Sequence, residues 1–158
     1  MDGVSSDRFD PNGTTTRSMI VTILYRLEGK PAVSGTNPFD DVTEGQWYTD
    51  AVIWANENGI VEGYGRGQFG PSDTITREQF ASILYRYASF KSWDISKEAD
   101  LSSYEDASSI SSWAEAAMKW ANAEGLITGR TDTALAPEGS TTRAEAAAIL
   151  MLAIEALS

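Results

Sequence analysis

Three similar stretches of sequence decide the fold: TRSMIVTILYRL at residues 16–27, TREQFASILYRY at 76–87 and TRAEAAAILMLA at 142–153. The second copy begins 60 residues after the first, and the third begins 66 residues after the second. Apolar residues recur at helical spacing in each copy, which predicts amphipathic helices near residues 15–28, 76–89 and 142–157. The residues expected to face a core are Ile20, Ile23, Leu24, Leu27, Phe80, Ile83, Leu84, Tyr87, Ala146, Ile149, Leu150 and Ala153.

These helices carry start signals. Thr76 is followed three residues later by Gln79, and Thr142 by Glu145, which is the pattern of a capping box. The first copy departs from this pattern, because its corresponding residue is Met19.

A second motif lies upstream of two of the three stretches. Trp47, Ala51, Trp54 and Ala55 have the i, i+4, i+7, i+8 spacing of a buried helix stripe. The same pattern returns 66 residues later, so helices are predicted over 47–58 and 113–124, each ended by a left-handed glycine. The later copy and the two glycines are Trp113, Ala117, Trp120, Ala121, Gly59 and Gly125.

The repeats predict an all-α architecture. Three similar second helices favour a central three-helix bundle with threefold pseudosymmetry, and the first helices would lie in peripheral lobes. We expect one domain made of half a first repeat (1–30), a second repeat (38–90), an insertion (91–103) and a third repeat (104–158). Because the first repeat has no first helix here, we expect that helix upstream of Met1 in a longer protein.

Composition excludes several classes of protein. The 158 residues include 23 acidic and 12 basic side chains, for a net charge of −11, and neither cysteine nor histidine. Disulfides, thiolate zinc sites, Ser-His-Asp triads and cysteine nucleophiles are therefore excluded. Nucleic acids and anionic membranes are poor candidate partners, because both need a basic surface. No apolar run approaches the roughly 18 residues of a membrane helix, and no signal peptide is visible, which fits a cytoplasmic protein or a piece of a secreted one.

An arginine follows the capping threonine in every copy: Arg17, Arg77 and Arg143. A cation at a helix N-terminus is disfavoured by up to about 1 kcal/mol, because that end is partially positive. One interpretation is an external anion, on which free helix N–H groups, the dipole and the guanidinium converge. The alternative is that Asp41 or Asp106 of a neighbouring lobe holds each arginine and so fixes one repeat against the next.

Several positions in fixed order resemble the S-layer homology (SLH) domain family. They are Phe39-Asp40-Asp41-Val42, Trp47-Tyr48, Ala51-Val52, Trp54-Ala55, Gly59-Ile60, Phe69-x-Pro71 and Thr76-Arg77-Glu78, with a similar third copy that includes Tyr104, Asp106 and Pro137. This resemblance covers nearly the whole chain. It implies a three-lobed helical fold and a secreted bacterial module that binds secondary cell-wall polysaccharide, often pyruvylated, attached to peptidoglycan.

The resemblance also implies a binding site. A pyruvate-ketal carboxylate on a wall sugar would be the anion, and Asp41 and Asp106 would orient the arginines. Trp47 and Trp113 either join the core or border a groove where an indole face stacks on a sugar. The expected ligand-binding residues are Arg17, Arg77, Arg143, Asp41, Asp106, Trp47, Trp113, Gly63 and Gly129. No catalytic residue, metal, cofactor or membrane insertion is expected, and self-assembly or protein–protein interaction at the cell surface is the alternative role.

Two other functions have weaker support. Asp41 and Glu78 would be the carboxylate pair of a glycosidase, but carboxylates are so plentiful here that the pair carries little weight. A calcium loop requires acidic ligands at fixed spacing, a glycine at position 6 and a glutamate at position 12. The N-terminal residues that suggest such a loop without matching its spacing are Asp7, Asp10, Asn12 and Gly13.

Overall fold

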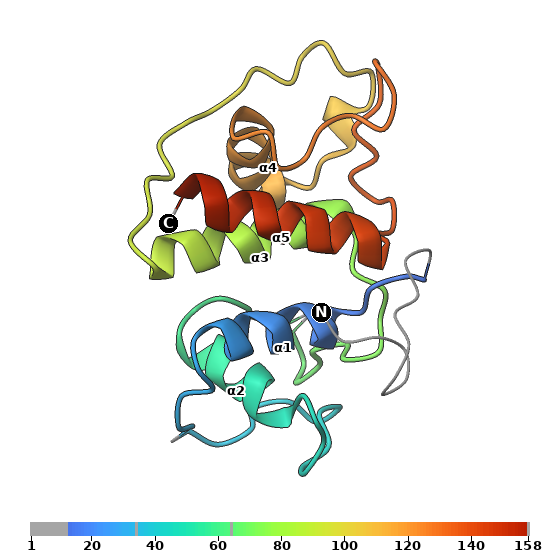
Figure 1. Cartoon of the computed structure of the whole chain (residues 1–158). Helices are drawn as coiled ribbons and strands as arrows, with labels where there is room; N and C mark the ends of the chain where they lie inside the picture. The colour runs from blue at the N-terminus through green and yellow to red at the C-terminus, as the bar shows by residue number, and fades with distance from the viewer. Residues whose placement is uncertain (1–12, 34, 64, 158) are drawn as a thin grey trace. The chain divides into compact units, whose positions relative to one another are not determined.

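The computed structural model describes residues 13–33, 35–63 and 65–157, and within these ranges the chain is helical, with isolated bridges and no β-strand (Figure 1). The all-α prediction is confirmed. The elements are α1 (Arg17–Leu27), α2 (Thr49–Glu57), α3 (Arg77–Phe90), η1 (Ala107–Ser109), η2 (Ser112–Ala114), α4 (Glu115–Ala123) and α5 (Arg143–Leu157), where η denotes a 3₁₀ turn.

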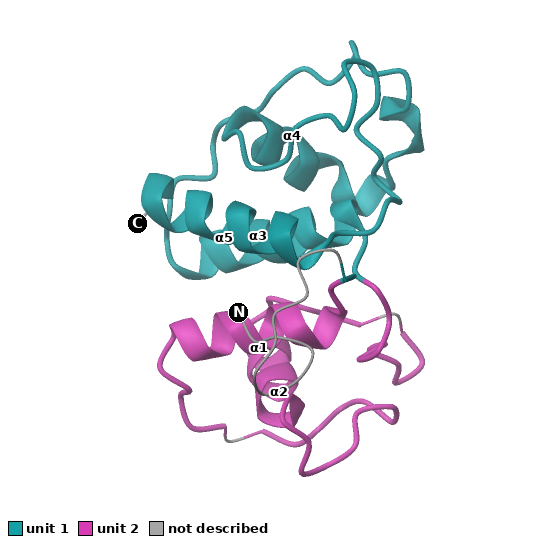
Figure 2. Ribbon diagram, turned by 45° about the vertical axis from the view of Figure 1, so that its right-hand side comes forward, with its two compact units in different colours: residues 1–14, 75–158 teal, residues 15–74 magenta. Residues whose placement is uncertain are grey.

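The chain forms two compact units (Figure 2). Unit 2 runs from Thr15 to Thr74 and contains α1 and α2, whereas unit 1 contains α3, α4 and α5. Each unit therefore joins the second helix of one repeat to the first helix of the next. The central bundle would combine α1 of unit 2 with α3 and α5 of unit 1, and it remains a prediction.

The predicted capping boxes at Thr76 and Thr142 are confirmed. The Thr76 hydroxyl accepts from the Gln79 N–H at 3.2 Å, and the Gln79 side chain accepts from the Thr76 N–H at 2.9 Å. Thr142 and Glu145 exchange the same two bonds, both at 3.1 Å. In α1 the sulfur of Met19 takes the place of the amide oxygen, since it accepts from the backbone N–H of the N-cap residue at 3.5 Å. A thioether is a weak acceptor, so this variant is the weakest of the three caps.

The predicted glycine stops of the first helices are also confirmed. Gly59 and Gly125 have φ of +71° and +74°, the left-handed conformation that glycine adopts without strain. The next residue closes a Schellman turn in each case. Its N–H donates to a carbonyl five residues earlier at 2.8 Å, from Ile60 to Ala55 and from Leu126 to Ala121.

The starts of the first helices were predicted two residues too early. Trp47 and Trp113 precede α2 and α4, and each side chain is 57% exposed, so neither joins the buried stripe. Before α2 the chain makes a turn, in which the Thr49 hydroxyl accepts from the Gln46 N–H at 2.9 Å and donates to the Thr43 carbonyl. This turn delays the helix and points Trp47 away from the core. The remaining stripe residues are buried, as predicted: Ala51, Trp54, Ala55, Ala117, Trp120 and Ala121.

The second helices bury the predicted faces of α3 and α5 completely. In α1, Ile20 and Leu24 are buried and Ile23 is half-buried, but Leu27 is exposed because it is the last residue of a shorter helix. Aromatic contacts join each second helix to its neighbouring first helix. The rings of Tyr25 and Trp54 lie 5.6 Å apart between α1 and α2, and those of Tyr85 and Trp120 lie 5.5 Å apart between α3 and α4.

The predicted insertion is a mostly exposed stretch without regular structure. Trp93 within it, to which the sequence assigns no role, packs its ring edge-on against Tyr87 of α3 at 5.7 Å. Leu101 is buried and the Ala99 N–H donates to the Lys119 carbonyl at 3.1 Å, so both the beginning and the end of the segment contact unit 1.

Candidate functional site

The two repeated aspartates hold the loop that precedes a second helix. In both copies one carboxylate accepts from two successive backbone N–H groups, which fixes the start of the Pro-containing loop. The acceptors and donors are Asp41 with Phe69 and Gly70, both at 2.8 Å, and Asp106 with Leu135 and Ala136, at 2.9 and 2.8 Å. The Leu135 N–H is the main reason that the pKa of Asp106 lies below its ordinary value; burial opposes this effect, and the Ala136 N–H and the charge of Arg77 add to it.

Arg17 binds the same loop from the carbonyl side. Its Nε donates to the Phe69 carbonyl at 2.9 Å, and its guanidinium carbon lies 4.8 Å from the centre of the Phe69 ring. Asp41 holds the N–H of that residue, so Arg17 and Asp41 grip the two sides of one loop residue. The predicted partnership of arginine and aspartate is thus mediated by the backbone of Phe69.

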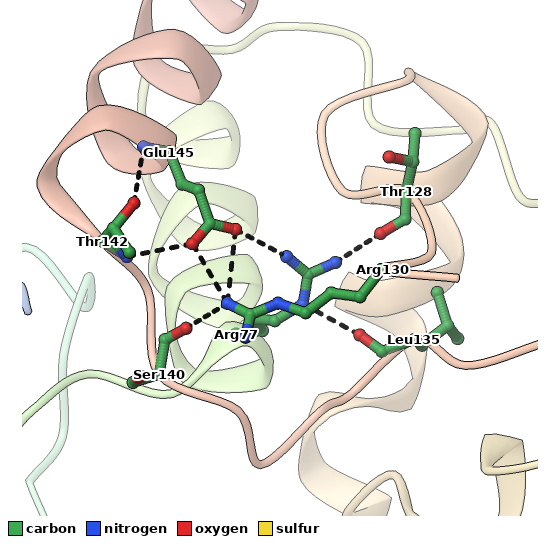
Figure 3. A network of polar contacts seen from close by, with 7 residues as sticks. All are labelled: Arg77, Thr128, Arg130, Leu135, Ser140, Thr142 and Glu145. Carbon is green, nitrogen blue, oxygen red and sulfur yellow. Dashed lines mark hydrogen bonds and ion pairs between the residues drawn. The ribbon is translucent and has the colours of Figure 1, made fainter. Parts of the chain in front are cut away.

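Arg77 repeats this contact in unit 1 and extends it into a network (Figure 3). Its Nε donates to the Leu135 carbonyl at 2.8 Å, Nη2 donates to the Thr128 carbonyl, and Nη1 pairs with Glu145 at 3.2 Å. Arg130 approaches the same carboxylate at 3.0 Å and donates to the Ser140 carbonyl. Burial, together with the charge of Arg130, lowers the pKa of Arg77, and the charges of Glu145 and Asp106 partly oppose this effect.

The helix N-termini are not free to bind an anion in the way that the sequence suggested. The first N–H of each second helix donates to a backbone carbonyl: Arg17 to Asp73 at 3.0 Å, Arg77 to Gly139 at 2.9 Å and Arg143 to Gly13 at 3.0 Å. In α1 and α3 the second N–H also has a carbonyl acceptor, and the third is held by the capping threonine. The predicted convergence of free N–H groups is therefore wrong. The three arginines are only 5–8% exposed, and direct ligand contact by them stays a prediction.

The two predicted glycines fit under an aromatic ring. A Cβ on Gly63 would lie 2.6 Å from Cε1 of Phe39, and one on Gly129 would lie 2.8 Å from Cε1 of Tyr104. Gly63 also has a φ of +81°. These close approaches explain why the loop has glycine at both positions, whether or not their N–H groups contact a ligand.

An open groove of about 690 Å³ lies in unit 2 on the outer side of the same loop. Its walls come from the aspartate, the glycine-rich turn and the Pro-containing loop: Asp41, Gly65, Arg66, Gln68, Gly70, Pro71, Ser72 and Asp73. Of the predicted ligand-binding residues in unit 2, only Asp41 belongs to this lining.

Arg66 is the cation of this groove and was missed by the sequence interpretation. Its side chain is exposed, and among the residues that the structure describes it makes no hydrogen bond or ion pair. Its φ is +56° between two left-handed glycines, Gly65 and Gly67. A non-glycine residue in this conformation costs about 1–3 kcal/mol, and such strain clusters at functional sites. The available signal was an arginine between two glycines in a chain with only 12 basic residues.

The alternative functions gain nothing from the geometry. The Glu78 carboxylate is buried and accepts from the N–H and hydroxyl of Ser111, at 2.8 and 2.7 Å. Asp7, Asp10 and Asn12 lie outside the described residues. Across 13–33, 35–63 and 65–157, no group of three or more acidic residues is arranged to hold a metal ion.

The chain belongs to the S-layer homology domain family, whose pattern matches residues 38–81 and 103–147. It is 35% identical over 153 residues to the exoglucanase XynX of Acetivibrio thermocellus, covering 95% of this chain and 14% of the relative. It is 33% identical over 156 residues to the surface-layer 125 kDa protein of Lysinibacillus sphaericus, covering 97% and 13%. It is 28% identical over 158 residues to a cellulosome-anchoring protein of Acetivibrio thermocellus, covering 97% and 35%.

The chain thus spans about a third or less of each of these relatives, and their printed activities belong to those whole proteins. Family membership assigns the chain to cell-surface anchoring, at the wall of the cell. Within the described part of the chain, no helix has both the length and the apolar character needed to cross a membrane.

Proposed function

We propose that this S-layer homology domain anchors its parent protein non-covalently by binding a secondary cell-wall polysaccharide through a carboxylate such as a pyruvate ketal. The observation that carries the proposal is Arg66. An exposed cation on the edge of a groove in a chain of net charge −11 offers one local site for an acidic sugar. A guanidinium binds a carboxylate through two parallel hydrogen bonds, which also fixes the orientation of the sugar.

The other groove residues suit a polar ligand. Gln68 and Ser72 offer donors and acceptors for sugar hydroxyls, and both are exposed. Asp41 is already engaged by two N–H groups, so its part is to hold the wall of the groove in place. Arg17 supports the same wall from the carbonyl of Phe69. In this proposal the buried arginines shape the groove and Arg66 meets the carboxylate.

The equivalent loop of the third repeat differs in charge. The position equivalent to Arg66 is Asp132 (66 + 66 = 132), and Arg130 in that loop is committed to Glu145. A carboxylate would be repelled there. We therefore expect acidic sugars to bind to the second repeat in preference to the third.

The test is sedimentation of the 158-residue chain with purified wall sacculi. We expect co-sedimentation that disappears when the secondary polymer is stripped from the sacculi with acid. Arg66→Gly should weaken binding about tenfold or more, because a charge-assisted hydrogen bond contributes about 1.5–3 kcal/mol.

Lys30→Gly is the matched control. Lys30 is an exposed cation in the same unit with a similar left-handed φ of +53°, but it lies outside the groove lining. Both substitutions remove one positive charge and one strained residue. Equal loss in the two variants would reduce Arg66 to a net-charge effect. Binding that survives the acid treatment would refute the polymer as ligand and favour the alternative of protein–protein assembly.

A further inference from the structure

The two units share a rule of packing: the second helix of one repeat is covered by the first helix of the next. In unit 2, α2 packs along α1, and in unit 1, η2 and α4 pack along α3. On α3 the covered face is marked at both ends. Glu78 at its start binds Ser111 at the beginning of η2, and Tyr85 two turns later meets the ring of Trp120.

The same face of α5 has no such cover among the described residues. Adding 66 to the α3 positions 78, 81, 82 and 85 gives the corresponding residues of α5, which are separated by i, i+3, i+4 and i+7 and so share one face. All four are apolar, and they are Ala144, Ala147, Ala148 and Met151.

Burial separates this face from its counterparts. Glu78 and Ala81 of α3 are buried, as are Ser18, Val21 and Thr22 at the equivalent places on α1. On α5, Ala144 and Ala148 are exposed, and the side chain of Met151 is 62% exposed. Met151 stands where Tyr25 and Tyr85 each meet the tryptophan of a first helix. The neighbouring Leu152 and Ile154 extend the apolar surface.

We propose that this face of α5 is a docking site for one more first helix of the α2 and α4 type, supplied by a further S-layer homology repeat. The chemistry of the occupant follows from the two filled sites, which present Ala51, Trp54 and Ala55 or their counterparts. The small residues allow close approach of the helix axes, and the indole covers position 151. Ala144 offers no carboxylate, so the new contact would lack the Glu78–Ser111 type of bond and be mainly apolar. This inference is independent of what the domain binds.

The methionine methyl groups provide a direct readout. The chain has four methionines, and Met151 is the one on the α5 face, whereas Met118 is buried in α4. A synthetic peptide with the sequence of residues 38–61, which contains α2, is titrated into the 158-residue chain labelled at its methionine methyls. We expect the Met151 signal to shift and the Met118 signal to stay. The same peptide with Trp54→Ala should bind at least tenfold more weakly.

Two substitutions in the chain sharpen the test. Met151→Tyr restores the residue found at this place in α1 and α3, and should tighten peptide binding severalfold; Met151→Glu should abolish it. Leu27→Glu, an exposed apolar residue of unit 2, is the matched control and should leave binding unchanged. Because an isolated helix forms poorly, the peptide is also fused to the C-terminus through a flexible linker, which raises its effective concentration. The fusion should raise Tm in the parent chain but not in Met151→Glu.

Two results would overturn the proposal. The first is a Met151 signal that does not respond to the peptide together with an unchanged Tm in the fusion. The second is concentration-dependent dimerisation of the unmodified chain that Met151→Glu abolishes, which would make a second copy the occupant of the face.

Discussion

Replacement of Arg77 by alanine is expected to destabilise unit 1 by about 3–5 kcal/mol. The side chain is 6% exposed, and its guanidinium binds two carbonyls and one carboxylate. Removing it leaves the carbonyl of the fully buried Leu135 without its donor, which costs about 1–3 kcal/mol. Breaking a buried ion pair costs about 3–5 kcal/mol, and Glu145 is partly solvated, so the lower part of that range applies. Since domains are stable by about 5–15 kcal/mol in all, this variant approaches unfolding.

Arg130→Ala is the comparison that isolates burial. Arg130 pairs with the same carboxylate, but its side chain is 37% exposed, and exposed pairs contribute about 1 kcal/mol or less. Urea unfolding at neutral pH, followed by tryptophan fluorescence and far-UV circular dichroism, gives the two free-energy changes. We expect Arg77→Ala to exceed Arg130→Ala by at least about 2 kcal/mol. Equal losses, or a loss below about 1 kcal/mol for Arg77→Ala, would refute the clamp.

This expectation changes how a binding experiment on the arginines is interpreted. From the sequence, alanine at Arg77 and Arg143 was expected to weaken wall retention without unfolding the domain. The contacts of Arg77 indicate that retention and folding would be lost together. Loss of binding in Arg77→Ala is evidence for a ligand contact only if the variant keeps the unfolding midpoint of the parent chain.

Two further predictions concern stability. Ala136 has a left-handed φ of +52°, where the equivalent residue of the second repeat is Gly70 at +76°. Ala136→Gly should therefore stabilise the chain by about 0.5–1 kcal/mol, and Gly70→Ala should destabilise it; unchanged urea midpoints would contradict this. Burial alone would raise the pKa of Glu145, but the hydrogen bonds from Thr142 and the charges of Arg130 and Arg77 hold it below its ordinary value. A depressed pKa stabilises the fold above the unfolded value of about 4.3, and this contribution is lost as pH falls through the folded pKa. Glu145→Gln, which keeps an oxygen acceptor for the cap, should flatten the loss of stability below about pH 4, and identical acid limbs would count against the network.

Much of the helical structure was predictable because its signals are local. A capping box, a left-handed glycine and an apolar stripe each involve residues within about eight positions of one another. The buried faces of α3 and α5 and the stops at Gly59 and Gly125 follow from such patterns alone. Trp47 and Trp113 were placed wrongly because their spacing also fits a buried stripe, whereas a turn before the helix decides which side they face.

The candidate site was predictable in composition more than in geometry. The repeated aspartates and arginines do converge on one loop, but through the backbone of Phe69 and Leu135. Glu145 was recognised as part of a cap, and nothing in its local sequence indicates that it also receives two arginines. Arg66 was passed over because no neighbouring residue in the sequence shows that its guanidinium is left on the edge of a groove.

By itself, the sequence determined the repeat, the helix boundaries to within two residues and an acidic chain without cysteine or histidine. These properties depend on composition and on interactions within a few turns of the chain. The tertiary structure decided which charges are buried and which face outward, because Arg17 and Arg77 find their carbonyl partners 52 and 58 residues away. It also decided that the face of α5 around Met151 has no covering helix, since coverage depends on which helix packs against which and not on the helix's own pattern.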